Sequence, residues 1–251
     1  MTGDIQANER PFAAAGILMI VSIIAVMAGQ TYIGAVFDWE DKPFDAVFRM
    51  YRDRLPLIQV FWFIFAIGSM LLIPISLLLY SCFRNGRDEL LRIGTGFGII
   101  AGFSYGMGIM RWVLLADALS GSSAAAGIGA GSAEEIFHAF NVNAGNSFGE
   151  TVAPLSHAAM AVCLGLAIIM NRDISDRITR VFAFLQTATG IGIALRPLEY
   201  VGLKTLGRFS DVLLVGWAVI FMGYGIYLVY RSFSEARIRE QREDERKRIN
   251  E

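Results

Sequence analysis

Residues 91–119 read LRIGTGFGIIAGFSYGMGIMRWVLLADAL, an apolar run longer than the roughly 20 residues with which a helix crosses a bilayer. Glycine recurs in this run at every fourth position, at Gly94, Gly98, Gly102 and Gly106. Because residues four apart share one face of a helix, these glycines let neighbouring helices approach closely in lipid. We expect this helix to be the packing centre of the fold. Its glycine face would contact other helices of the same chain, or a partner in a homo-oligomer or in another membrane protein.

The composition indicates an integral membrane protein. Hydrophobic residues make up 55% of the chain and charged residues only 18%, whereas soluble domains carry roughly 25% charged residues. Six apolar runs predict an all-α polytopic fold with six transmembrane helices that contact membrane lipids. A kink at Pro74 in the second is tolerable, because neighbouring helices can satisfy the freed carbonyl. The predicted spans are 11–37, 56–83, 91–119, 148–170, 178–203 and 209–230. The net charge of −1 argues against a nucleic-acid partner.

The segments outside these spans are predicted to hold short helices, one loop and a tail. Residues 38–55 and 133–146 carry apolar residues at helical spacing among polar ones, which predicts two short helices on the membrane surface. Residues 120–132 read SGSSAAAGIGAGS and predict a flexible loop. Residues 1–231 therefore form the transmembrane domain, and residues 232–251 form a charged, helical, cytoplasmic tail.

The Lys and Arg residues predict the orientation in the membrane. With both termini in the cytoplasm, 14 of them lie on the cytoplasmic side and 6 outside, as the positive-inside rule requires. The cytoplasmic residues are Arg10, Arg84, Arg87, Arg92, Arg172, Arg177, Arg180 and the seven from Arg231 to Arg248, and those outside are Lys42, Arg49, Arg52, Arg54, Lys204 and Arg208. Arg111 and Arg196 are not counted, because both fall within predicted spans.

Five ionisable residues fall in the outer half of this predicted bundle, namely Arg111, Glu150, His157, Arg196 and Glu199. Charged groups at membrane depth are costly, and they pair with one another. We therefore expect Arg111 and Arg196 to pair with Glu150 and Glu199. Each residue also has a plain structural interpretation, as an anchor at headgroup level, a charge at a helix end or a histidine in the core.

These residues predict a polar pocket that binds a small anionic molecule, a lipid headgroup or a partner helix without catalysis. Polar residues of the preceding segment would form its lid, namely His138, Asn141, Asn143 and Asn146. The alternative is a membrane-embedded enzyme in which Glu150 and His157 carry out acid–base or metal-assisted chemistry on a lipid.

The sequence predicts no cofactor. His138 and His157 are the only two histidines, and two imidazoles can ligate haem b or help to bind a divalent metal, which keeps both open as alternatives. Their separation of 19 residues matches no ligand spacing that we know. The glycine clusters that begin at Gly94 and Gly127 lack the flanking strand and acidic residue of a dinucleotide-binding loop.

Two dipeptides carry a family resemblance. Arg111 and Trp112 close the third predicted span, and Gly149 and Glu150 open the fourth. In these pairs the chain resembles a bacterial family of small multi-pass membrane proteins of unknown function. The resemblance implies a location in the bacterial cytoplasmic (inner) membrane and implies no reaction. Members often continue the second pair with histidine, whereas this chain has Thr151.

Overall fold

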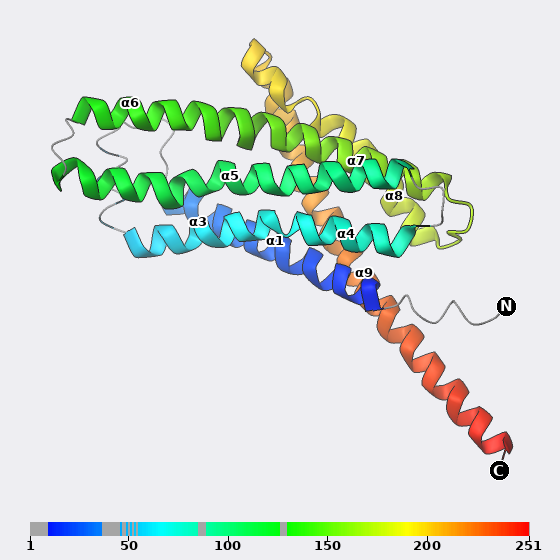
Figure 1. Ribbon diagram of the computed structural model, residues 1–251. Coiled ribbons are helices and arrows are strands. Elements are labelled where there is room, and N and C mark those ends of the chain that lie inside the picture. Colours follow the sequence, from blue (N-terminus) through cyan, green and yellow to red (C-terminus); the bar gives the residue numbers. More distant parts are fainter. Residues whose placement is uncertain are drawn as a thin grey trace.

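The computed structural model describes residues 10–36, 55–84, 89–125 and 130–250, together with 46, 49, 51 and 53. Within these ranges every regular element is a helix (Figure 1). In chain order the elements are α1 (Arg10–Val36), α3 (Leu55–Met70), α4 (Leu72–Phe83), α5 (Glu89–Ala125), α6 (Ala130–Phe140), η2 (Asn141–Val152), α7 (Ala153–Met170), α8 (Arg177–Ile193), η3 (Arg196–Val201) and α9 (Lys204–Asn250). The surface helix predicted for 38–55 lies largely outside the described residues.

Six stretches of this structure are long and apolar enough to cross a membrane. They are Pro11–Ala35, Pro56–Phe83, Glu89–Leu114, Glu134–Met170, Arg177–Val201 and Lys204–Arg242. The predicted all-α, six-span membrane fold is thus confirmed. The second stretch is interrupted at Leu71, between α3 and α4, because Pro74 has no N–H to donate to the carbonyl of Met70.

Residues 120–125 and 130–132 of the predicted loop are helical instead, and residues 126–129 lie outside the described part of the chain. The prediction of a separate surface helix over 133–146 is wrong, because this segment continues into α7 without a break. α5 continues to Ala125, and α6, η2 and α7 form one unbroken helical run that lies antiparallel to α5 (Figure 1). Residues 120–125 read SGSSAA and are helical although serine and glycine favour a helix less than alanine does. The polar segment 133–146 stays helical because it packs on α5, where the backbones at Gly108 and Gly149 come into contact.

The fifth predicted span, 178–203, corresponds to the stretch Arg177–Val201, but it is not a single α-helix. α8 ends at Ile193, and Arg196 and Glu199 lie in the 3₁₀ helix η3. Pro197 explains the break, because it has no N–H to donate to the carbonyl of Ile193. The Ser210 hydroxyl of α9 donates to that carbonyl instead, at 3.0 Å. α9 then runs without interruption through the predicted boundary at 231.

The glycine face of α5 packs within the chain. A Cβ atom added at any of the four glycines would come within 3.0 Å of a side chain on another helix. Gly94 faces α7, Gly98 faces α4 and α7, Gly102 faces α4 and Gly106 faces α3. The chain's own helices therefore occupy this face, and a partner bound there stays a prediction.

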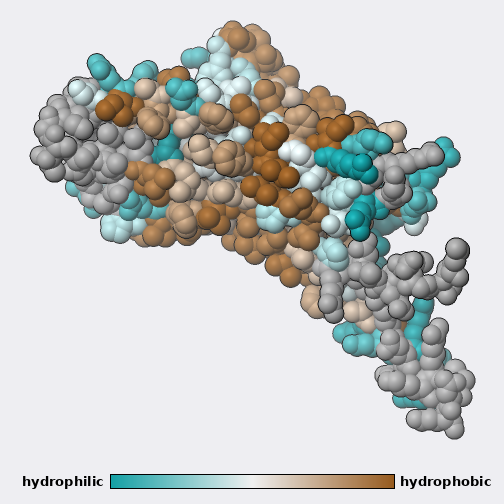
Figure 2. Space-filling model, in the orientation of Figure 1, coloured by the Kyte–Doolittle hydropathy of each residue, from teal (hydrophilic) through white to brown (hydrophobic). Residues whose placement is uncertain are grey.

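Two buried hydrophobic clusters hold the bundle together. The larger one joins α1, α4, α7, α8 and α9, and it includes Trp217 and Phe221. The smaller one joins α1, α3 and α5 around Trp62 and Trp112, whose rings stack at 5.4 Å. On the face seen in Figure 2, the surface is largely hydrophobic over the middle of the bundle, and hydrophilic residues gather toward its ends. A surface of this kind is suited to contact with lipid.

Candidate functional site

Arg111 packs against glycine residues of a neighbouring helix. Its guanidinium covers Gly145 of η2 so closely that a Cβ atom there would be 2.6 Å from Cζ. Nη1 donates to the carbonyl of Gly108 at 2.5 Å, and Nε donates to Oδ1 of Asn141 at 3.0 Å. A Cβ atom at Gly108 would lie 2.6 Å from the Cα of Gly149. The absence of side chains on both helices thus creates the space that the guanidinium fills.

The helix beside Arg111 is a π-helix of 12 residues. π-Helices are rare, usually one turn long, and frequent at functional sites. Two hydroxyls follow the same five-residue spacing, because Ser147 donates to the carbonyl of Val142 at 3.2 Å and Thr151 donates to that of Asn146 at 2.7 Å. η2 contributes groups to Arg111 on one side and, through Glu150, to η3 on the other.

Arg196 is surrounded by carboxylates. Its Nη1 is paired with Glu199 and with Asp211, the latter at 3.2 Å, and its Nη2 lies 3.7 Å from Oε2 of Glu150. The Tyr200 hydroxyl donates to the same oxygen of Glu150 at 2.5 Å. These contacts join η2, η3 and α9. Three negative charges face one arginine, so the charge of Arg196 is fully compensated.

The structure confirms the predicted pairing of Arg196 with Glu150 and Glu199. Arg111 differs from the expectation, because its hydrogen bonds go to a neutral amide and a carbonyl, although Glu150 and Tyr200 lie within electrostatic range of it. The two arginines therefore belong to one polar layer at the same end of the bundle. We define the polar layer as Arg111, Asn141, Glu150, Arg196, Glu199, Tyr200 and Asp211.

His157 lies below this layer, in the core. Its side chain is 1% exposed. Nδ1 lies 3.3 Å from the Tyr105 hydroxyl, and the ring meets that of Trp217 edge to face at 4.0 Å between centroids. Tyr105 in turn lies within electrostatic range of Arg196 and Asp211. The contacts of His157 are thus with Tyr105 and Trp217 rather than with Glu150.

The predicted lid residues do not join the site as a group. His138 is exposed on α6, and exposed Asn143 donates to the carbonyl of Ala139 at 3.4 Å. Among the expected lid residues, Asn141 contacts Arg111. His138 and His157 lie 19 residues apart on one continuous helical run. Even with the smaller rise of its π-helical part, roughly 20 Å or more separates them along the axis. One chain therefore does not bring both imidazoles to a single metal or haem iron.

Three members of this region were missed by reasoning from sequence. Asp211 stands in the last apolar run, and an acidic residue at such a position is a signal that was available. Tyr200 adjoins Glu199, but its hydroxyl reaches Glu150 only because η3 turns back toward η2. Tyr105 gave no signal, because a tyrosine in an apolar helix is an ordinary core residue.

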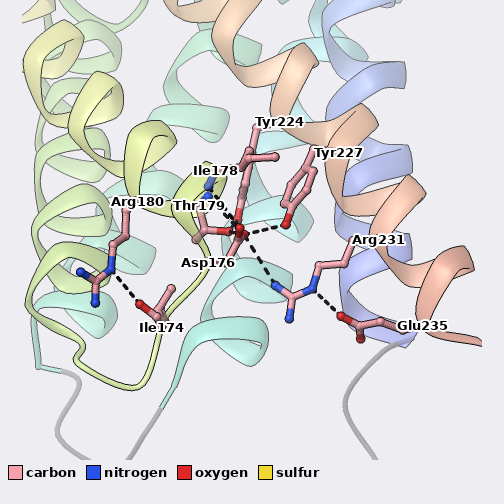
Figure 3. A network of polar contacts seen from close by, with 9 residues as sticks. All are labelled: Ile174, Asp176, Ile178, Thr179, Arg180, Tyr224, Tyr227, Arg231 and Glu235. Carbon is pink, nitrogen blue, oxygen red and sulfur yellow. Dashed lines mark hydrogen bonds and ion pairs between the residues drawn. The ribbon is translucent and has the colours of Figure 1, made fainter. Parts of the chain in front are cut away.

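A second polar network closes the opposite end of the bundle (Figure 3). Asp176 is the N-cap of α8, and its carboxylate accepts from the amides of Ile178 and Thr179 at 3.1 and 3.2 Å. The Thr179 hydroxyl also donates to it, and the Tyr227 hydroxyl does so at 2.7 Å. Because Thr179 gives its only hydroxyl proton to Asp176, the Tyr224 hydroxyl at 3.0 Å donates to Thr179.

This network connects α8 to the base of the charged tail. Arg231 lies 3.9 Å from the Asp176 carboxylate, donates to Glu235 at 2.7 Å and covers the ring of Phe12 in α1 at 5.2 Å. Partial burial raises the pKa of the Asp176 carboxyl, but hydrogen bonds from Thr179, Tyr227 and two amides lower it by more, so the pKa lies below its usual value. Asp176 is therefore held in its ionised form.

The fold and its two polar ends define a polytopic α-helical membrane protein. Residues 14–232 match the family described as a domain of unknown function (DUF4386), and the chain belongs to that family. This agrees with the sequence resemblance to a family whose function is not known. No curated protein and no solved structure shows significant similarity to the chain.

Proposed function

We propose that this chain is a non-enzymatic component of the bacterial cytoplasmic membrane that binds the phosphate of an anionic lipid headgroup at Arg111. With both termini in the cytoplasm, as its Lys and Arg distribution favours, the polar layer lies at the outer face of the bilayer. The observation that carries this proposal is the placement of the Arg111 guanidinium against glycine residues of a neighbouring helix, with neutral acceptors as its hydrogen-bond partners.

The hydrogen bonding of Arg111 supports an anionic ligand. A guanidinium has five N–H donors in a planar fork that matches a phosphate group. Only Nε and Nη1 donate to residues that the structure describes. Arg196 is a poor alternative, because Glu150, Glu199 and Asp211 already surround it and would repel phosphate.

The surroundings favour a lipid over a free anion or a partner helix. Leu114 on α5, one turn beyond Arg111, is 64% exposed, and Phe148 on η2 is 41% exposed. Apolar side chains that face outward beside a cation at the end of a span are suited to acyl chains below a headgroup. A free anion would gain nothing from them.

The enzyme alternative has weaker support. Glu150 is bonded to Tyr200 and paired with Arg196, whereas His157 contacts Tyr105 and Trp217 in the core. The two residues are seven positions apart on one helical run, about 10 Å along its axis. A general acid and base would have to share one reacting group, which this separation disfavours.

Lipid-dependent stability tests the proposal. The purified protein in neutral detergent is heated with added phosphatidylglycerol or with phosphatidylcholine, and the unfolding midpoint is followed by circular dichroism. A ligand that binds only the folded state raises the midpoint. We expect phosphatidylglycerol to raise the midpoint of the parent protein and to leave that of Arg111→Gln unchanged.

Arg180→Gln is the matched control. Arg180 lies at the opposite end of the bundle, where its Nε donates to the carbonyl of Ile174 at 2.8 Å. Like Arg111→Gln, Arg180→Gln removes one positive charge, so the general electrostatic attraction of the protein to anionic lipid falls equally in both variants. The proposal is wrong if phosphatidylglycerol stabilises Arg111→Gln as much as Arg180→Gln.

A further inference from the structure

Three buried polar groups in the core have no partner among the described residues. They are Nε2 of His157, both amide atoms of Gln186 and Nε1 of Trp217. Gln186 is fully buried, and Trp217 is 4% exposed. The three residues come from α7, α8 and α9; α8 packs on the other two helices, and His157 of α7 contacts Trp217 of α9. Buried polar groups are nearly always hydrogen-bonded, so three such groups in one region require an explanation.

Contacts between α8 and α9 place Gln186 and Trp217 at the same level. Phe182 stacks on Tyr224 at 3.7 Å, and the Ser210 hydroxyl bonds the carbonyl of Ile193 at 3.0 Å. In the sequence of α8, Gln186 lies between Phe182 and Ile193. In the sequence of α9, Trp217 lies between Ser210 and Tyr224. Positions 182, 186 and 193 share one face of a helix, as do 210, 217 and 224. Gln186 and Trp217 are therefore on the faces that the two helices turn toward each other.

Helix α7 closes the third side of this region. Gly190, one turn from Gln186, packs so closely on α7 that an added Cβ atom would be 2.9 Å from the Cβ of Ala161. His157, one turn before Ala161, brings its ring to 4.0 Å from that of Trp217. The three unpartnered groups thus border one interior zone at the junction of α7, α8 and α9.

We propose that this zone binds water, held by the imidazole of His157, the amide of Gln186 and the indole N–H of Trp217. A buried water typically makes about three hydrogen bonds to groups that otherwise lack partners. The indole N–H is a donor and the Gln186 amide is both donor and acceptor, so water matches both kinds of group. The Tyr105 hydroxyl lies 3.3 Å from the other ring nitrogen of His157, Nδ1, which leaves Nε2 for the water. The proposal does not depend on lipid binding at Arg111.

X-ray radiolytic footprinting tests the proposal in the unmodified protein. The pulse converts bound water to hydroxyl radicals, which oxidise neighbouring side chains even when bulk solvent does not reach them. Trp112 is the matched control, because it is also a tryptophan, is 1% exposed and packs between Trp62 and Phe137. We expect Trp217 to be oxidised several-fold faster than Trp112. Oxidation of Trp217 at or below the rate of Trp112 overturns the proposal.

Gln186→Leu supplies an independent readout. If water occupies the zone, leucine removes one of its partners, so the oxidation rate of Trp217 falls toward that of Trp112 and the unfolding midpoint drops. If the amide has no partner at all, leucine relieves an unpaired polar group and the midpoint stays equal or rises. An equal or higher midpoint therefore contradicts bound water. Should this variant fail to fold, the comparison of the two tryptophans in the parent protein decides alone.

Discussion

Replacement of Asp176 removes the centre of the network that fastens α8 to α9. Its carboxylate accepts from the amides of Ile178 and Thr179 and from the hydroxyls of Thr179 and Tyr227, and it faces Arg231. Asp176→Ala removes the carboxylate that accepts all of these hydrogen bonds. Asp176→Asn keeps one carbonyl oxygen, which suffices for the N-cap, but it removes the charge.

The expected magnitudes follow from these contacts. Loss of a helix N-cap costs about 1 kcal/mol, and loss of the bond from the Tyr227 hydroxyl to an ionised carboxylate costs about 1.5 kcal/mol. The Arg231 pair at 3.9 Å is partly exposed and adds little. We expect Asp176→Ala to lower the free energy of unfolding by roughly 2.5 kcal/mol and Asp176→Asn to lower it by roughly 1 kcal/mol.

The same carboxylate predicts a pH dependence. Its pKa in the folded protein lies below the usual value of 3.8. The stability that it contributes is therefore complete above the pKa of the unfolded chain, and it is lost as the pH falls through the folded pKa. The parent protein should lose stability more steeply than Asp176→Asn when the pH falls from about 5 to about 3, because only the parent has this carboxyl to protonate.

Thermal unfolding in neutral detergent, followed by circular dichroism at neutral and acidic pH, measures both effects. Thr187→Val is a suitable control, because the Thr187 hydroxyl bonds only the carbonyl of Ala183 in its own helix. The reasoning is refuted if Asp176→Ala is as stable as Thr187→Val at neutral pH. It is also refuted if Asp176→Asn shows the same pH dependence as the parent protein.

Four further substitutions test the packing and the polar layer. Gly145→Ala places a Cβ atom 2.6 Å from Cζ of Arg111, so the guanidinium must move; we expect a lower unfolding midpoint and a weaker response to phosphatidylglycerol, although the charge is kept. Gly190→Ala overpacks the junction of α7 and α8 and should lower the free energy of unfolding by about 1–3 kcal/mol. Gly96→Ala is the control: its Cβ atom meets nothing within 4 Å, so it should be neutral or stabilising in the same unfolding assay. Arg196→Gln leaves three carboxylates without their cation. Because these carboxylates are partly exposed to solvent, we expect a cost of about 1 kcal/mol; unchanged stability would show that they do not depend on Arg196.

Much of the fold was predictable because lipid is a uniform solvent. Each spanning segment must satisfy its own backbone and present an apolar surface, so apolar runs reveal the helices one by one. The same cost of charge in lipid predicted that Arg196 would pair with Glu150 and Glu199. The end of α8 was also within reach, since Pro197 marks it.

The length, composition and spacing of the apolar runs determined by themselves that this is a six-span helical membrane protein, because these properties are local. Tertiary structure alone decided that residues 130–170 form one run with a π-helix at its centre, that Arg111 rests on glycine, and that Asp176 fastens α9. These features depend on how far each helix is rotated and shifted against its neighbours. The rotation and the shift of each helix are set by the close packing of many side chains at once. They cannot be inferred from one segment of sequence, because they depend on the helices that it packs against.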